Sequence, residues 1–211
     1  MRKPQLLAAA VEALHDRGFS ATRIADVAQR AGTSSPAVLY YFGSKDELLE
    51  QALEYADAQA FDAWKRTFET LPRASDKLWF IVESSAYQRT PADDWTLWIE
   101  MWARALRRPE VRVHYERLDR RMRLLIAEVI REGQAAGEFG ECDADGAAQT
   151  LTALLDGLGV QRTLDHEDLP PERMVDLCLR WVERELECDL GASGGNYWRE
   201  RSEGDPSSAR A

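Results

Sequence analysis

Residues 22–45 read TRIADVAQRAGTSSPAVLYYFGSK, and this stretch decides the fold. Apolar residues recur at helical spacing on both sides of Gly32. The pattern predicts two short helices, one over 23–31 and one ending at Phe42, joined by a tight turn. Two helices at this spacing are typical of a helix-turn-helix, whose second helix enters the major groove of DNA.

The ends of these helices carry the expected capping residues. Thr22 is expected to cap the first helix and Ser34 or Ser35 the second, because their side-chain oxygens accept backbone N–H groups. Pro36 is acceptable in the first turn of the second helix, where its missing N–H would have had no partner. The local sequence therefore agrees with the helical periodicity.

Side chains suited to DNA lie in and beside this motif. Hydroxyl and backbone N–H groups at helix N-termini can bind phosphate, adjacent tyrosines can pack on sugar or a thymine methyl, and a lysine adds a point charge. Packing in a three-helix core is the alternative, which we accept for Val38 and Phe42 but not for Tyr41 and Lys45. The candidate DNA-binding residues are Thr22, Arg23, Thr33, Ser34, Ser35, Pro36, Ala37, Tyr40, Tyr41 and Lys45.

The whole chain has 211 residues, of which 45% are hydrophobic and 30% charged, the composition of an ordinary globular protein. No apolar run approaches the roughly 20 residues of a membrane helix, and charges interrupt the N-terminal apolar stretch, so neither a membrane span nor a signal peptide is expected. Cys142, Cys178 and Cys188 lack metal-ligand spacing and a disulfide framework. We therefore expect a cytoplasmic protein without metal.

The net charge of −10 is unevenly distributed. Residues 1–46 contain six basic and four acidic residues, whereas the rest of the chain contains 21 basic and 33 acidic ones. Phosphate contact is therefore expected at the N-terminal end only. The arginines at 112–123 could suggest a second nucleic-acid surface, but the acidic residues around them favour a solvated helix face.

Helical periodicity continues beyond the motif. After a helix from 45 to about 68 we expect helices near 75–88, 93–106, 109–136, 144–163 and 171–187, separated by Gly and Pro. No convincing pair of strands with a hairpin turn is recognised, so the predicted fold class is all-α. The Gly-, Ser- and charge-rich segment 190–211 is expected to be a disordered polar tail.

The N-terminal stretch resembles the DNA-binding domain of the tetracycline-repressor (TetR/AcrR) family of bacterial regulators. The resemblance covers about the first fifty residues by motif, and the remainder by helix count and length. It implies an all-helical homodimer, with a DNA-binding domain at 1–48 and a ligand-binding and dimerisation domain at 49–189. The matching residues are Gly18, Phe19, Thr22, Ile24, Ala25, Ala28, Ala31, Gly32, Ser34, Phe42, Ser44, Lys45 and Leu48.

Position 39 departs from this family pattern. Many members carry Tyr where this chain has Leu39, so the phosphate contact of that tyrosine is not expected here, whereas Tyr40 and Tyr41 carry over. The order Val38-Leu39-Tyr40-Tyr41-Phe42 is similar to the subgroup that includes the choline-responsive repressors of betaine synthesis. The resemblance implies a repressor that leaves a palindromic operator when it binds a small effector.

An aromatic stripe lies in the segment 93–111, DDWTLWIEMWARALRRPEV. Its three tryptophans share one helical face, which is typical of core packing, but the set together favours a pocket. An acid in an aromatic wall suits a cation, so choline-like amines or polyamines are the expected effectors. Asp156 is interpreted either as a second pocket acid or as a hydrogen-bonding residue at a dimer interface. The candidate ligand-binding residues are Trp95, Trp98, Glu100, Trp102, Tyr115 and Asp156.

The last two expected helices, 144–163 and 171–187, are apolar on more than one face. A helix that is apolar on two sides is covered on two sides, so these helices are expected to form a homodimer interface. Ala153, Gly157 and Val160 form a face of small residues that would allow close helix approach.

Two other function classes are considered. A helical enzyme using Asp93, Asp94, Glu100 or His114 lacks a metal-binding or nucleophile motif, so no catalytic residue, cofactor or metal is expected. A DNA-binding protein without an effector is the second alternative.

Overall fold

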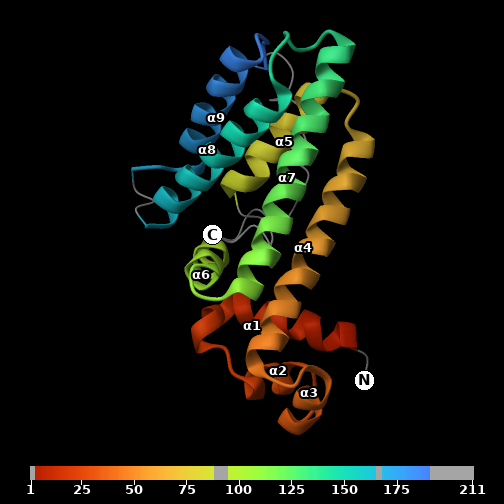
Figure 1. Cartoon of the computed structure of the whole chain (residues 1–211), viewed down its shortest axis with the longest axis vertical. Helices are drawn as coiled ribbons and strands as arrows, with labels where there is room; N and C mark the ends of the chain where they lie inside the picture. Colours follow the sequence, from red (N-terminus) through yellow and green to blue (C-terminus); the bar gives the residue numbers. More distant parts are fainter. Residues whose placement is uncertain (1–2, 88–94, 165–167, 191–211) are drawn as a thin grey trace, which may run out of the picture. The chain divides into compact units, whose positions relative to one another are not determined.

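The computed structural model describes residues 3–87, 95–164 and 168–190. Within these ranges every regular element is an α-helix, which confirms the all-α class (Figure 1). No helix in the described part of the chain is long and apolar enough to cross a membrane. The helices are α1 (Lys3–Ala21), α2 (Ile24–Arg30), α3 (Ser35–Phe42), α4 (Lys45–Thr70), α5 (Ala74–Tyr87), α6 (Trp95–Ala105), α7 (Pro109–Ala136), α8 (Ala144–Leu164) and α9 (Pro171–Glu185).

Most helix ends fall within two residues of the predicted positions. α7 has the predicted bounds, and α8 and α9 differ from the prediction only at their C-terminal ends. The predicted start of α6 at residue 93 lies outside the described residues, as does the predicted tail beyond residue 190. The positions of Pro and Gly therefore predicted the helix ends well, because these residues determine which backbone conformations are possible at a helix end.

The end of α1 is irregular. The helix continues to Ala21 across a break at Gly18, which has φ +71°. Thr22 is fully buried, and its hydroxyl lies 2.6 Å from the carbonyl oxygen of Gly18 and 3.0 Å from that of Ala13. Arg23 takes the N-cap position of α2, and its N–H donates to the Asp26 carboxylate at 2.8 Å. The cap and the DNA contact predicted for the Thr22 side chain are therefore wrong.

The helices pack into two compact units. The first unit comprises Met1–Thr67 and Gln88–Arg120. In it, α1, α2, α3 and the first turns of α4 surround a core to which α6 contributes Leu97. This core holds the helix-turn-helix against α1, so the motif is supported on its inner side.

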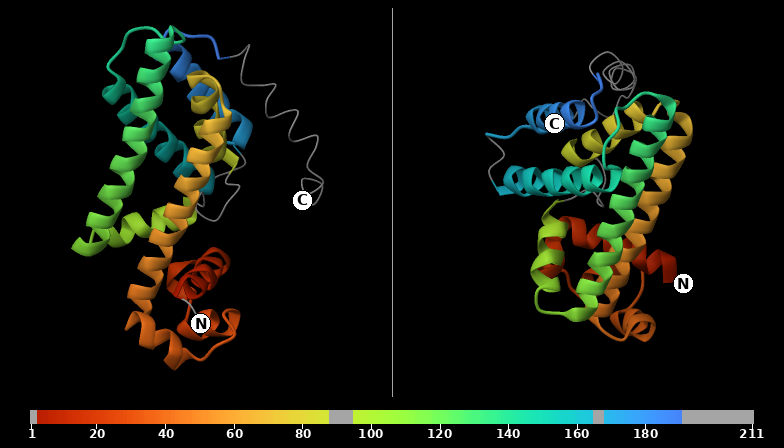
Figure 2. Two further views of the ribbon diagram at one scale, coloured as in Figure 1. Left: turned by 90° about the vertical axis from the view of Figure 1, so that its right-hand side faces the viewer. Right: turned by 45° about the horizontal axis from the view of Figure 1, so that its top comes forward.

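The second unit comprises Phe68–Tyr87 and Arg121–Ala211. α5, α8 and α9 contact one another in it (Figure 2). The Glu138 carboxylate accepts hydrogen bonds from the N–H groups of Ala74 and Ser75 at the start of α5. The predicted division at residue 48 does not coincide with these units, because α4 and α7 each contribute to both.

Candidate DNA interface and ligand site

α3 has one buried and one exposed face. Val38 and Phe42 are buried in the core of the first unit, which confirms their predicted packing role. Tyr40 is 87% exposed, Tyr41 41% and Leu39 40%. The rings of Tyr40 and Tyr41 meet edge to face, with centroids 5.6 Å apart and an interplanar angle of 85°. The helix thus presents a large aromatic and aliphatic surface that the protein itself does not cover.

The turn before α3 uses some of the groups predicted to bind phosphate. Ser34 is the N-cap, and its hydroxyl accepts the Ala37 N–H at 3.4 Å, so the choice between Ser34 and Ser35 is settled for Ser34. The Thr33 N–H donates to the Ala28 carbonyl at 2.9 Å and closes the end of α2. The Thr33 N–H is therefore engaged within the protein, and the half-buried side chain of Thr33 stays a candidate for DNA contact.

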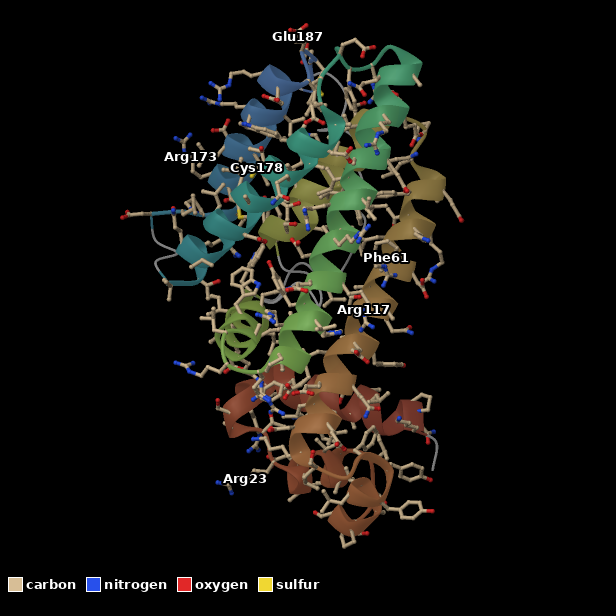
Figure 3. The ribbon with its side chains drawn as sticks, viewed as in Figure 1. Arg23, Phe61, Arg117, Arg173, Cys178 and Glu187 are labelled. Carbon is tan, nitrogen blue, oxygen red and sulfur yellow. The ribbon has the colours of Figure 1, made fainter. Side chains whose placement is uncertain are left out.

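Two cations flank the motif. Arg23 is exposed at the start of α2, and its side chain extends away from the ribbon (Figure 3). Lys45, the first residue of α4, donates from Nζ to the Ser20 carbonyl at 3.0 Å. An ammonium has three N–H donors, so this bond leaves capacity for a phosphate oxygen. The bond also fastens the start of α4 to the end of α1.

Three of the predicted ligand residues form an aromatic cluster in the first unit. Trp95 and Trp102 of α6 have ring centroids 6.4 Å apart, and Tyr115 of α7 stands edge-on to Trp102, also at 6.4 Å. Trp98 lies on the same helix and packs against the buried Met101, Val111 and Leu118. The Trp102 Nε1 is buried and finds no hydrogen-bond partner among the described residues. The cluster is the candidate ligand face.

The carboxylate of Glu100 contacts the end of α1 and not the rings of this cluster. The Glu100 carboxylate accepts the Phe19 N–H, the first backbone donor after the break in α1. A side chain at Gly18 would also collide with this carboxylate, because a Cβ there would lie 2.9 Å from Glu100 Oε1. Asp156 lies on α8 in the second unit, and its predicted roles stay open.

Two arginines outside the predicted sites, Arg104 on α6 and Arg108 between α6 and α7, extend this contact to α4. Arg104 lies over the Phe19 ring at 3.7 Å from the centroid and pairs with Glu50 of α4 at 3.3 Å. Arg108 pairs with Asp46 at 2.5 Å, near the N-terminus of α4. Their partners are more than fifty residues away in the chain, so no local pattern could have indicated them.

A cavity of about 210 Å³ lies among α1, α4, α6 and α7 within the first unit. His114 lines it, with its side chain 11% exposed and its Nδ1 3.0 Å from Glu54 Oε1. Arg117 contacts both groups, at 2.8 Å from Glu54 Oε1 and 2.7 Å from His114 Nδ1. Burial is the main cause that lowers the pKa of His114 below its ordinary value, and the Arg117 charge lowers it further, while Glu54 opposes both.

Metal binding and nucleophilic chemistry each depend on suitable groups of side chains. Within the described ranges no group of three or more His, Cys, Asp or Glu side chains could hold a metal ion. Burial raises the pKa of the Cys178 thiol to about 12, which keeps it protonated and unreactive. The features that suit a binding function are the exposed face of α3 and the aromatic cluster on α6 and α7.

Comparison with known proteins agrees with this reading. Residues 6–52 match the family described as bacterial regulatory proteins, tetR family, and residues 77–187 match the BetI-type transcriptional repressor C-terminal domain. The chain belongs to the TetR family of bacterial transcriptional regulators. Its C-terminal region is of the BetI type, as the resemblance implied. Proteins of this family are regulators and not enzymes.

Relatives of this TetR-family chain cover almost its whole length. The BetI regulator of Escherichia coli K12 is 28% identical over 193 residues, covering 90% of this chain and 96% of the relative. A transcriptional regulator from Saccharomonospora viridis, solved in complex with choline, is 31% identical with a TM-score of 0.77, covering 86% of this chain and 95% of that one. A TetR-family regulator from Rhodococcus sp. is 27% identical with a TM-score of 0.73, covering 87% of this chain and 97% of that one.

The lowered pKa of His114 predicts how the stability of this regulator depends on pH. The unfolded chain binds the proton more tightly than the folded one, so His114 contributes its full stability above the ordinary histidine pKa of about 6.5. That contribution is lost as the pH falls from this value toward the lowered pKa of the folded state. Urea unfolding between pH 5 and pH 7.5 should show this loss in the parent protein.

His114→Gln should flatten this dependence, because glutamine carries no proton in this range. His15→Gln, at an exposed histidine of the same unit, is the control for the loss of a histidine. Equal slopes for the parent protein and His114→Gln would contradict the assignment.

Proposed function

We propose that the protein is a dimeric repressor that binds a palindromic operator and releases it when a small organic cation binds the aromatic cluster. The observation that carries the proposal is the position of that cluster. Trp95 and Trp102 lie on α6, and the same helix contacts α1 through Glu100 and α4 through Arg104. One helix thus carries both the ligand face and the contacts that support the DNA-binding motif.

The chemistry of the cluster favours a quaternary ammonium ligand. Aromatic faces attract cations by roughly 0.5 to 2 kcal/mol each, and more when water is excluded. A quaternary amine has no N–H groups and needs no carboxylate partner, whereas each ammonium of a polyamine does. Since Glu100 is engaged by the Phe19 N–H, a choline-like ligand suits the site better than a polyamine. The choline complex of the Saccharomonospora viridis relative supports the same choice.

The proposed release works through α6. Ligand among the aromatic rings stabilises one placement of α6, and that placement determines where Glu100 and Arg104 meet α1 and α4. A ligand shifts such an equilibrium only by binding one state more tightly than the other. The ligand-bound state is then the one in which two DNA-binding motifs no longer fit successive half-sites of the operator.

Choline titration followed by tryptophan fluorescence tests the ligand face. Saturable quenching is expected, and Trp102→Leu should weaken it roughly 2- to 30-fold because one aromatic wall is lost. Trp64→Phe, on α4 of the same unit, is the matched control and should bind as the parent does. Tighter binding of a neutral or anionic aromatic compound than of choline would refute the cationic effector.

Glu100→Ala tests the coupling separately from ligand binding. The variant removes the acceptor of the Phe19 N–H but leaves all the rings in place, so its choline affinity should stay within about twofold of the parent value. Its operator release by choline should be reduced about tenfold or more, measured as the choline concentration that dissociates half of the complex. Glu116→Ala, at an exposed acid that pairs with Arg112 of its own helix, is the control. A loss of choline affinity in Glu100→Ala with intact coupling would instead place Glu100 in the ligand site.

The dimer is proposed to form through the helices at 144–163 and 171–187. Gly157 is exposed on α8, and a Cβ built there meets no atom of the same chain within 4 Å. A large side chain at this position is therefore tolerated by the single subunit, and only a second subunit would exclude it.

Gly157→Trp should consequently yield a folded monomer that has lost operator binding, because one half-site provides too few contacts. Light scattering gives the mass, and circular dichroism checks that the helices are retained. Gly157→Ala is the control and should remain dimeric. A dimer in Gly157→Trp would show that the interface lies elsewhere.

A further inference from the structure

α3 contains no side chain that can make a bidentate hydrogen bond to a base. Its eight residues, Ser35–Phe42, read SPAVLYYF and include no Arg, Lys, Asn, Gln, Asp or Glu. Those residue types provide the usual direct readout in the major groove, with arginine or lysine on guanine and asparagine or glutamine on adenine. Sequence preference through α3 must therefore come from single hydrogen bonds of its hydroxyl groups or from apolar contacts, and its exposed surface favours the apolar contacts.

The exposed face of α3 is apolar and aromatic. Pro36, Leu39 and Tyr40 stand at positions i, i+3 and i+4, so they share one side of the helix, and all three are exposed. The ring of Tyr40 has the edge contact with Tyr41 described above, which limits its freedom to turn away. An exposed leucine beside an exposed tyrosine on so short a helix leaves much apolar surface uncovered by the protein.

The major groove of DNA offers one apolar group on the base edges, the C5 methyl of thymine. We propose that α3 selects its operator by burying thymine methyl groups against Leu39 and the Tyr40 ring. The inference rests on the proposed function, in which α3 enters the major groove of each half-site. The group recognised on DNA is the thymine methyl. Leu39 is the residue most responsible for the preference for thymine.

The cations around α3 serve a different purpose in this arrangement. Lys45 lies on α4 and Arg23 precedes α2, so both flank the apolar face and neither belongs to α3. Contacts from such positions to phosphate fix the register of a protein on DNA and carry no sequence information. Affinity then depends on the flanking phosphate contacts, and discrimination between sequences on the methyl contacts.

Replacing thymine by deoxyuridine tests the proposal, because this change removes the methyl and keeps all base-pair hydrogen bonds. The operator is first selected from a pool of random duplexes with the full-length protein, and thymine is expected at the positions beneath α3. The selected duplex is then made with deoxyuridine at those positions. Binding should weaken roughly fourfold for each contacted methyl, the equivalent of about 0.8 kcal/mol.

Variants link the effect to the side chain. Leu39→Ala should reduce the difference in affinity between the thymine and deoxyuridine operators, because the larger part of the surface that covers the methyl is gone and only the Tyr40 ring is left. Lys45→Ala should weaken binding to both duplexes by the same factor and leave their ratio at the parent value. Leu106→Ala, at another exposed leucine of the first unit, should change neither affinity. 5-Methylcytosine at the same positions restores the methyl and should recover part of the binding lost with unmethylated cytosine.

The outcomes separate this inference from the function on which it rests. If selection enriches no sequence, the proposed operator binding fails, and the methyl inference fails with it. If a sequence is enriched but its deoxyuridine form binds as tightly as the thymine form, the function stands and the methyl contact is refuted. A selected site in which guanine dominates beneath the motif, with Arg23→Ala abolishing the preference, would refute it equally and assign the readout to Arg23.

Discussion

The carboxylate of Glu100 holds the broken end of α1, and the DNA-binding part of the first unit depends on this contact. Gly18 interrupts α1, so the Phe19 N–H begins a new turn without a partner inside its own helix. Glu100, from a helix 81 residues further along the chain, accepts that N–H. The contact works as an N-cap supplied by another element, and it also explains the need for glycine at position 18, where a side chain would meet the carboxylate.

The ion pairs around this contact extend it to α4. Arg104 stacks on the Phe19 ring and pairs with Glu50, while Arg108 pairs with Asp46. Each of these pairs is partly exposed, and such pairs contribute little to stability one at a time. Their contribution here is geometric, because they connect the end of α1, the start of α4 and the region of α6. In the proposed release, a change in α6 would reach the support of α3 through these contacts, without any contact between the ligand and α3.

The sequence predicted those features that depend on neighbours along the chain. Gly, Pro and capping residues act on adjacent backbone groups, and so the helix ends were located within a few residues. The buried face of α3 and the tryptophan face of α6 also followed from periodicity, because a helix repeats every 3.6 residues. Thr22 was misassigned because hydroxyl groups beside a helix start suit capping and burial equally well, and only the tertiary structure shows the carbonyls of Ala13 and Gly18 around it. The partner of Glu100 was unpredictable for the same reason, since its distance along the chain leaves no local signal.

An acidic protein that binds DNA must limit its dependence on charge, and this structure shows how. Several cations of the N-terminal part are engaged within the protein: Arg17 pairs with Asp26, Arg30 with Asp16 and Glu12, and Lys45 bonds to Ser20. Since these cations already have partners within the protein, a single subunit is expected to gain little counterion release and to bind DNA weakly. Two motifs held at the spacing of the half-sites bind one operator together, and the second motif then adds strongly to the affinity. Two motifs at another spacing bind only one half-site at a time. In the proposed dimer a small displacement of the motifs would be enough to release the operator, so the proposed control through α6 needs no change within α3 itself.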